Sequence, residues 1–136
     1  MFINYQKGEI GRMKVMLRAI EKGLLVSLPV VESRYDLILD DGKSLSRAQV
    51  KYCSRKNNQS DGCVGLDLQK DTRNNGKKRS YNSAEVDVIL VYIPQVDQIV
   101  CLTPDIFNNK RYISLRYNDT KNNQSRGVFL IKDYLW

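Results

Sequence analysis

Hydrophobic residues recur at helical spacing near the start of the chain. The members of this stripe, three or four residues apart, are Ile10, Met13, Leu17 and Ile20. The spacing predicts one helix between Lys7 and Lys22, with the stripe facing the core. Gly23 comes next and is typical of the residue just past a helix end.

Short runs rich in apolar and β-branched residues follow the predicted helix, separated by polar and glycine-containing stretches. They predict strands near residues 24–29, 35–40, 45–53, 64–68, 86–94, 98–102, 112–117 and 127–131. The run from Val86 to Tyr92 is nearly continuous in apolar residues, as expected of a central strand. One long helix on a mixed sheet, in a single α/β domain of 136 residues, is the simplest assembly.

A hairpin is predicted where the Asp-Gly step of residues 40–43 separates two strands. With a register centred between Gly42 and Lys43, Asp36 lies directly opposite Gln49, and Lys51 lies on the same face. Because side chains alternate across a strand, the other face is expected to point into a core. The residues expected there are Leu37, Leu39, Val50 and Tyr52.

These three polar groups suit metal-dependent chemistry on phosphate. The carboxylate of Asp36 and the amide oxygen of Gln49 are hard ligands of the kind that Mg²⁺ takes. Lys51 can orient or help deprotonate a water and offset the charge of a phosphorane-like transition state. The alternative from the pattern alone is an ordinary hairpin with Gln49 and Lys51 on its solvent face, because so short a motif recurs by chance.

The order of motifs along the chain supports the first interpretation. In sequence they are Lys7-Gly8 opening a helix, an extended segment 25–29, Ser33-Arg34-Tyr35-Asp36-Leu37-Ile38, Arg47-Ala48-Gln49-Val50-Lys51, Tyr81 and the segment 87–94. This order is similar to the PD-(D/E)xK nuclease superfamily. Within it, nearly the whole chain resembles the group I intron-associated homing endonucleases of the kind found in cyanobacteria.

The resemblance implies a restriction-endonuclease-like mixed β-sheet with a flanking N-terminal helix and β-hairpin extensions. It also implies a Mg²⁺-dependent endodeoxyribonuclease that makes double-strand breaks at a long target site. By this resemblance Asp36 corresponds to the metal-binding aspartate and Lys51 to the catalytic lysine. Gln49 stands in for the more usual Asp or Glu, so that Asp36 and Gln49 are the expected metal ligands.

The first helix departs from the superfamily pattern. A glutamate is common there in a Lys-Gly-x-x-x-Glu pattern, and this chain has Arg12 at that position. A cation beside the metal site repels Mg²⁺ and removes an acceptor. Two interpretations of Glu9 stay open: it replaces that glutamate from one turn earlier, or it is a first-turn glutamate favoured by the helix dipole. The chain is then either active or a catalytically impaired variant.

Three polar segments interrupt the predicted strands. Segments 56–62 and 121–127 are near-copies rich in Asn and Gln, and segment 73–79 carries four positive charges and no acid. Each alone reads as a solvated turn. Together, as β-hairpin tips, they have groups that pair with bases and phosphates in a major groove. The expected DNA-binding residues are Arg55, Lys56, Asn57, Asn58, Gln59, Arg73, Lys77, Lys78, Arg79, Tyr81, Lys121, Asn122, Asn123, Gln124 and Arg126.

Composition excludes several classes of function. The net charge of +7 indicates a polyanionic partner, and the absence of histidine excludes His-dependent nucleophile systems and His-dependent nucleases. The three cysteines lack a C-x-x-C spacing, so we expect buried, reduced thiols. No membrane span or signal segment is evident, which predicts a cytoplasmic protein without a membrane partner.

Size predicts assembly. A compact chain of this length has a radius of gyration of roughly 14 Å and therefore spans about one turn of duplex. Reading a long site then requires a homo-oligomer, at least a dimer, and the resemblance allows a tetramer. A DNA-binding variant that no longer cleaves, and a Holliday-junction-type structure-specific nuclease, are the alternatives to a homing endonuclease.

Overall fold

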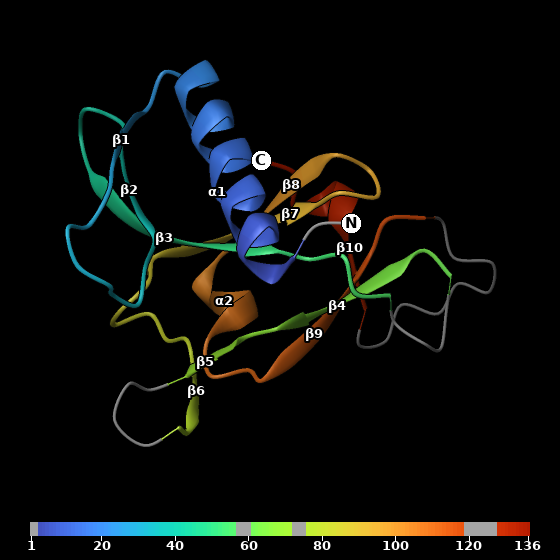
Figure 1. Cartoon of the computed structure of the whole chain (residues 1–136). Helices are drawn as coiled ribbons and strands as arrows, with labels where there is room; N and C mark the ends of the chain where they lie inside the picture. Colours follow the sequence, from blue (N-terminus) through green and yellow to red (C-terminus); the bar gives the residue numbers. More distant parts are fainter. Residues whose placement is uncertain (1–2, 57–60, 72–75, 119–127) are drawn as a thin grey trace.

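Helix α1 (Asn4–Glu21) packs against a five-stranded sheet in the computed structural model, which describes residues 3–56, 61–71, 76–118 and 128–136 (Figure 1). Its end at Gly23 is confirmed. Gly23 has φ +82°, and its N–H donates to the carbonyl of Ile20 at 2.9 Å. The N–H of Leu24 donates to the carbonyl of Ala19 at 2.9 Å, which completes a Schellman motif.

The helix turns a different face to the sheet than the apolar stripe predicts. Its buried residues are Gly11, Val15 and Ala19, whereas Met13, Leu17 and Ile20 are 66%, 57% and 62% exposed. The prediction that this stripe faces the core is therefore wrong for these three residues. Small residues on the buried face let the helix backbone approach the sheet, since a Cβ on Gly11 would lie 3.4 Å from the Cβ of Tyr52.

The five-stranded sheet has the order β1-β2-β3-β7-β8, in which β3 and β7 are parallel and the other neighbours antiparallel. Its strands are β1 (Leu25–Ser27), β2 (Leu37–Asp40), β3 (Leu45–Tyr52), β7 (Val88–Ile93) and β8 (Gln98–Leu102). The predicted hairpin register is confirmed, because Leu37 pairs with Ala48 and Asp40 with Leu45. The mixed α/β fold expected from the sequence is thus present.

The turn between β2 and β3 is held by its own aspartates. Asp41 Oδ1 accepts hydrogen bonds from the N–H groups of Lys43 and Ser44, each at 2.8 Å. These bonds hold the pKa of the Asp41 carboxyl below its usual value. Gly42 has φ +87°, a conformation that glycine adopts without strain. The Asp-Gly step therefore fixes the hairpin register locally.

Strand β7 is buried on both faces, which explains its continuous apolar sequence. Ile89, Val91 and Ile93 belong to one hydrophobic cluster, and Leu90 and Tyr92 to another that includes Val15 and Ala19 of the helix. The second cluster also contains Leu37, Leu39 and Val50, with Tyr52 packed against it, as predicted for that face of the hairpin.

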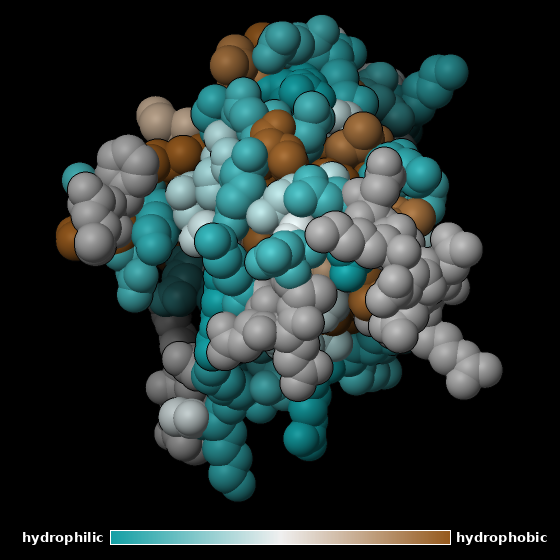
Figure 2. Space-filling view, turned by 90° about the vertical axis from the view of Figure 1, so that its right-hand side faces the viewer, coloured by the Kyte–Doolittle hydropathy of each residue, from teal (hydrophilic) through white to brown (hydrophobic). Residues whose placement is uncertain are grey.

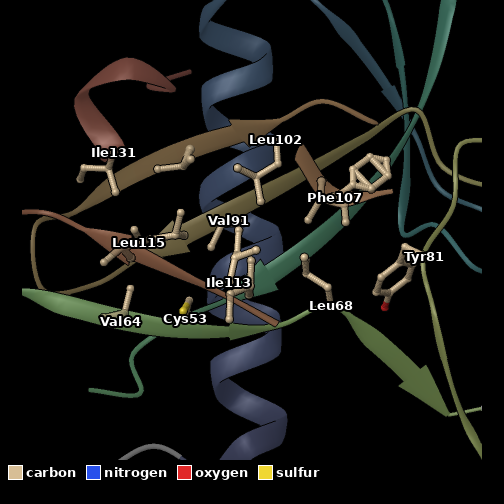
Figure 3. Packing of buried hydrophobic residues seen from close by; sticks show 14 of the residues in the cluster. Cys53, Val64, Leu68, Tyr81, Val91, Leu102, Phe107, Ile113, Leu115 and Ile131 are labelled. Atoms are coloured by element: carbon tan, nitrogen blue, oxygen red, sulfur yellow. The ribbon is translucent and has the colours of Figure 1, made fainter. Parts of the chain in front are cut away.

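A second sheet covers the face of the first that is opposite α1. It contains β4 (Cys63–Asp67), β9 (Tyr112–Arg116) and β10 (Val128–Leu130) in the order β10-β9-β4. The cluster between the two sheets includes Val64, Ile113 and Leu115 from this sheet and Val91 and Leu102 from the first (Figure 3). The shorter elements are β5 (Gln69–Asp71), β6 (Lys78–Ser80), α2 (Pro104–Phe107) and the 3-10 turn η1 (Ile131–Asp133).

Two of the three polar segments are confirmed in part as hairpin connections and one is not. Strands β5 and β6 pair antiparallel around residues 72–77, and Lys56 bridges antiparallel to Val64. Strands β9 and β10, however, are parallel neighbours. Segment 121–127 itself lies outside the described residues, so the prediction that it is a hairpin tip stays a prediction.

Candidate active site

Asp36 stands immediately before β2 and is tied to β3 by two hydrogen bonds. Its backbone N–H donates to the carbonyl of Ala48 at 2.9 Å. Its carboxylate Oδ2 accepts from the backbone N–H of Val50 at 3.0 Å. Because the last paired residue of β2 on this side is Leu37, the carboxylate takes the place that a further strand residue would occupy beside Val50. The Asp36 side chain is thereby fixed next to the peptide that joins Gln49 to Lys51.

Gln49 is a buried polar residue whose side chain is incompletely hydrogen-bonded. Its side chain is only 5% exposed, and its Nε2 donates to the carbonyl of Val50 at 3.2 Å. Its Oε1 is buried and has no hydrogen-bond partner within the described residues. A buried amide oxygen without a partner is unfavourable. This oxygen is therefore a free acceptor on the residue that the β2–β3 register sets opposite Asp36.

Lys51 is a half-buried cation. Burial lowers the pKa of its ammonium group, and the carboxylates of Asp67 and Asp36 oppose that effect. Its Nζ lies 5.0 Å from the centroid of the Tyr81 ring. The lysine is thus held in a partly apolar site between an aromatic face and two negative charges.

Tyr81 supports this arrangement from beneath. The guanidinium carbon of Arg34 lies 4.6 Å from its ring centroid, so two cations lie over one ring. Tyr81 is fully buried, its hydroxyl has no hydrogen-bond partner within the described residues, and burial raises its pKa. The sequence predicted a DNA contact for Tyr81, but a buried ring is placed to hold Lys51 and Arg34 instead.

Gln49 and Lys51 line a cavity of about 630 Å³. Residues that the sequence analysis did not assign to the site also line it: Asn4, Lys7, Asp67, Lys70 and Tyr112. Asp67 is the last residue of β4, and its Oδ2 lies 3.3 Å from Nζ of Lys78. Only the pairing of the second sheet over the first brings it near Lys51, and its one sequence signal is a polar residue ending an apolar strand.

Asp36 lines a separate pocket of about 200 Å³ that it shares with Arg12, the segment 28–33 and Tyr35. Arg12 Nη2 lies 2.6 Å from Oε2 of Glu9, so the two residues form an ion pair on one helix face. Glu9 is outside the first turn, because the helix begins at Asn4. The interpretation of Glu9 as a first-turn glutamate is therefore wrong.

The residues expected to bind DNA lie in several parts of the structure. Arg55, Lys56, Lys77, Lys78 and Arg79 are exposed. Arg55 also lines the large cavity, and Arg79 forms an ion pair with Glu85. The remaining expected residues, which lie outside the described part of the chain, are Asn57, Asn58, Gln59, Arg73, Lys121, Asn122, Asn123, Gln124 and Arg126.

The two near-copy segments are attached at one end of the second sheet. Cys63 of β4 pairs with Arg116 of β9, and the N–H of Tyr117 donates to the carbonyl of Gly62 at 2.8 Å. The first segment therefore ends beside the point where the chain leaves β9 toward the second.

Figure 2 shows a largely hydrophilic face, with hydrophobic residues in small separate groups.

The sequence predicts buried, reduced thiols and no membrane span. Cys53 and Cys63 are buried, as the sequence predicts, whereas Cys101 is half-buried, and all three are free. Burial raises the pKa of the Cys53 thiol to about 12, so it is not a nucleophile at neutral pH. In the described part of the chain, no helix is both long and apolar enough to span a bilayer.

Comparison with known proteins agrees with this geometry. Among curated proteins, none matches the chain. A solved structure, that of the bacterial homing endonuclease I-Ssp6803I, superposes with a TM-score of 0.80 at 21% identity and covers 98% of this chain and 89% of that one. At this identity the likeness shows a shared fold. The family model described as PD-(D/E)XK endonuclease matches residues 4–136, and the chain therefore belongs to the PD-(D/E)XK endonuclease family.

Proposed function

We propose that this chain is a Mg²⁺-dependent, sequence-specific homing endonuclease that makes double-strand breaks at a long DNA target. The observation that carries the proposal is the Asp36 carboxylate bound to the Val50 N–H, next along the chain from Gln49, whose buried Oε1 has no partner among the described residues. The β2–β3 register sets Asp36 opposite Gln49, so the two hard oxygen donors belong to adjoining segments of the hairpin. Family membership supports nuclease chemistry and the usual use of a divalent metal.

The donor set fits a magnesium ion better than a softer metal. In the described residues, no three His, Cys, Asp or Glu side chains gather closely enough to hold an ion. A site built on Asp36 and Gln49 has one carboxylate and one neutral oxygen. Mg²⁺ is usually held by one or two protein carboxylates together with water and substrate phosphate. Asp36 and Gln49 would hold the ion, which when bound activates water and offsets phosphate charge.

The protein groups have separate tasks in phosphodiester hydrolysis. The oxygen of a water forms a bond to phosphorus, and the bond from phosphorus to the leaving oxygen breaks. Lys51 Nζ orients the attacking water or stabilises negative charge on the phosphate, because an ammonium group offsets the charge that develops there. The Tyr81 ring packs against Lys51, and Asp67 offsets the cost of partly burying that cation.

DNA binding follows from the same arrangement. Arg55 and Lys70 line the cavity with Lys51, and the net charge is +7. The Asn/Gln-rich segments 56–62 and 121–127 are the candidates for base recognition. The protein spans only about one helical turn of duplex, roughly 34 Å. A homo-oligomer, a dimer or a tetramer, is therefore needed to cut both strands of a long site.

Cleavage of a plasmid library carrying random inserts tests this proposal. We expect linear products when Mg²⁺ is present, recovery of one family of long target sequences, and no products with EDTA or with Asp36→Asn. Asp40→Asn is the matched control, because Asp40 is an aspartate at the other end of β2. Metal-independent cleavage, or equal cleavage by Asp36→Asn, would contradict the proposal. Cutting only of branched DNA would favour the structure-specific alternative.

Arg12 favours a second candidate, a DNA-binding protein of this fold with impaired cleavage. Its side chain lines the pocket of Asp36 and is paired with Glu9. If the cation weakens metal binding, Arg12→Glu should raise the single-turnover cleavage rate, and Arg12→Gln should raise it less. Arg18→Glu, on the same helix, controls for the change in net charge. Unchanged or lower rates for Arg12→Glu at saturating Mg²⁺ would remove the basis of this candidate.

A further inference from the structure

An apolar stripe on the outer face of α1 has no partner among the residues that the structure describes. Met13, Leu17 and Ile20 are each more than half exposed, at 66%, 57% and 62%. Ile10 and Leu24, which are half-buried and pack against the core under the helix, continue the same alternating spacing of three and four residues at the two ends. This is the spacing of a and d positions in a coiled-coil seam.

The buried face of the helix does not need this stripe. Gly11, Val15 and Ala19 already pack against the sheet. Large apolar side chains gain nothing from facing water, and a contiguous row of them is typical of a protein contact. A helix with a stripe at a and d spacing is best covered by a second helix of the same kind.

The charges at the two ends of the stripe identify the orientation of such a helix. Lys7 and Glu21 lie on one flank, at equivalent heptad positions two heptads apart, and neither forms an ion pair within the described residues. An antiparallel copy of α1 brings Lys7 near Glu21 of the partner at both ends. In a parallel copy the two equivalent flanks lie on opposite sides of the seam, so Lys7 and Glu21 do not meet. Lys14, between them on this flank, is neutralised by Asp97 at 3.1 Å.

We propose that the stripe formed by Met13, Leu17 and Ile20 is a contact between two copies of this chain, with their α1 helices antiparallel about a twofold axis. A twofold contact is self-complementary, so each Lys7 meets the Glu21 of the other copy. This inference rests on the assembly in the proposed function and names its surface. It does not depend on cleavage.

Oligomeric state without DNA tests the surface. Sedimentation of the parent chain over a range of concentrations should show a dimer or larger assembly. Leu17→Glu should shift at least tenfold toward the smaller species, because it places two carboxylates in the seam. Leu45→Glu is the matched control, since Leu45 is 66% exposed but lies at the start of β3. Glutamate favours helix, so Leu17→Glu retains its fold by circular dichroism, and Ile20→Glu gives an independent second variant.

Each result has a defined meaning. A parent chain that stays monomeric at every concentration overturns both the inference and the proposed assembly, while metal-dependent cleavage is judged separately. An assembled parent with equally assembled Leu17→Glu and Ile20→Glu variants overturns the inference alone. Dissociation of Leu45→Glu to the same extent also overturns it, because the contact would then not be confined to the stripe.

Charge reversal tests the orientation. Lys7→Glu and Glu21→Lys should each weaken assembly several-fold, and the double variant should recover most of the loss. Recovery requires the two residues to face each other across the contact. Loss of assembly in both single variants without any recovery in the double variant would overturn the antiparallel arrangement.

Discussion

The carboxylate of Asp36 accepts a hydrogen bond from the backbone N–H of Val50 at 3.0 Å. This one contact fixes a charged group from the start of β2 beside the Gln49 to Lys51 segment of β3. The paired residues of β2 end at Leu37, so no backbone carbonyl of β2 is opposite the Val50 N–H. The Asp36 side chain accepts that hydrogen bond instead. The same contact makes Asp36 a structural residue as well as a candidate ligand.

Replacing Asp36 should therefore affect cleavage and stability differently. Asp36→Ala should lower single-turnover cleavage by about 100-fold or more and reduce the free energy of unfolding by about 1–3 kcal/mol, because the Val50 N–H loses its acceptor. DNA affinity without metal should change little. Cleavage, urea unfolding and binding titrations measure the three effects. Parent-like cleavage by Asp36→Ala or by Lys51→Ala would show that the assigned site is wrong.

Stability should depend on pH through Lys51. Its folded-state pKa lies below the ordinary value of 10.5 because of burial. The folded protein then binds the proton less tightly than the unfolded chain, so this lysine costs stability at neutral pH and the cost is lost as pH rises toward 10.5. Lys51→Met should be more stable than the parent at neutral pH, by about 1 kcal/mol per unit of pKa shift.

The measurement is urea unfolding of both proteins from neutral pH to about the ordinary lysine pKa. The difference between Lys51→Met and the parent should narrow as pH rises. Lys43→Met, at the exposed β2–β3 turn, controls for the change in net charge. A difference that stays constant, or that grows with pH, would contradict a depressed pKa for Lys51.

Two substitutions of Tyr81 should separate the role of its ring from that of its hydroxyl. Tyr81→Phe removes a buried hydroxyl that has no partner among the described residues, so it should leave stability unchanged or raise it. Tyr81→Leu should cost about 2–4 kcal/mol through lost packing. It should also lower cleavage, because Lys51 and Arg34 lose the ring beneath them. Thermal unfolding and single-turnover rates test this, and equal cleavage by both variants would show that the ring does not position Lys51.

The basic segment at the β5–β6 hairpin should act on all DNA sequences alike. Replacing Lys77 and Lys78 should weaken binding to every duplex. It should also reduce the slope of log affinity against log salt by roughly 1 for each lost phosphate contact. Titrations of one duplex at several salt concentrations give the slope. An unchanged slope would mean that these lysines make no phosphate contacts.

The Asn/Gln-rich segments should instead control discrimination. Changing Asn57, Gln59, Asn122 or Gln124 to alanine should reduce the preference for the matched site by about 1–3 kcal/mol for each lost bidentate base contact. Competition between matched and mismatched duplexes measures this preference. A uniform loss of affinity from every variant would indicate that the segments only follow the backbone.

The sequence by itself determined the features that depend on neighbouring residues. The Asp-Gly turn at Gly42 and the alternation of polar and apolar residues set the register that pairs Leu37 with Ala48 and places Asp36 across from Gln49. The end of α1 at Gly23 and the central strand β7 were equally local. In each case a backbone conformation or a two-residue period is written into a few adjacent positions.

Tertiary structure decided which of two apolar faces the helix buries. Helical spacing identified Met13, Leu17 and Ile20, but the close approach of helix and sheet selected the small residues Gly11 and Ala19. Spacing measures only periodicity, whereas burial depends on the space that another element leaves. The burial of Tyr81 and the placement of Asp67 near Lys51 were hidden for the same reason, because both follow from the second sheet packing against the first.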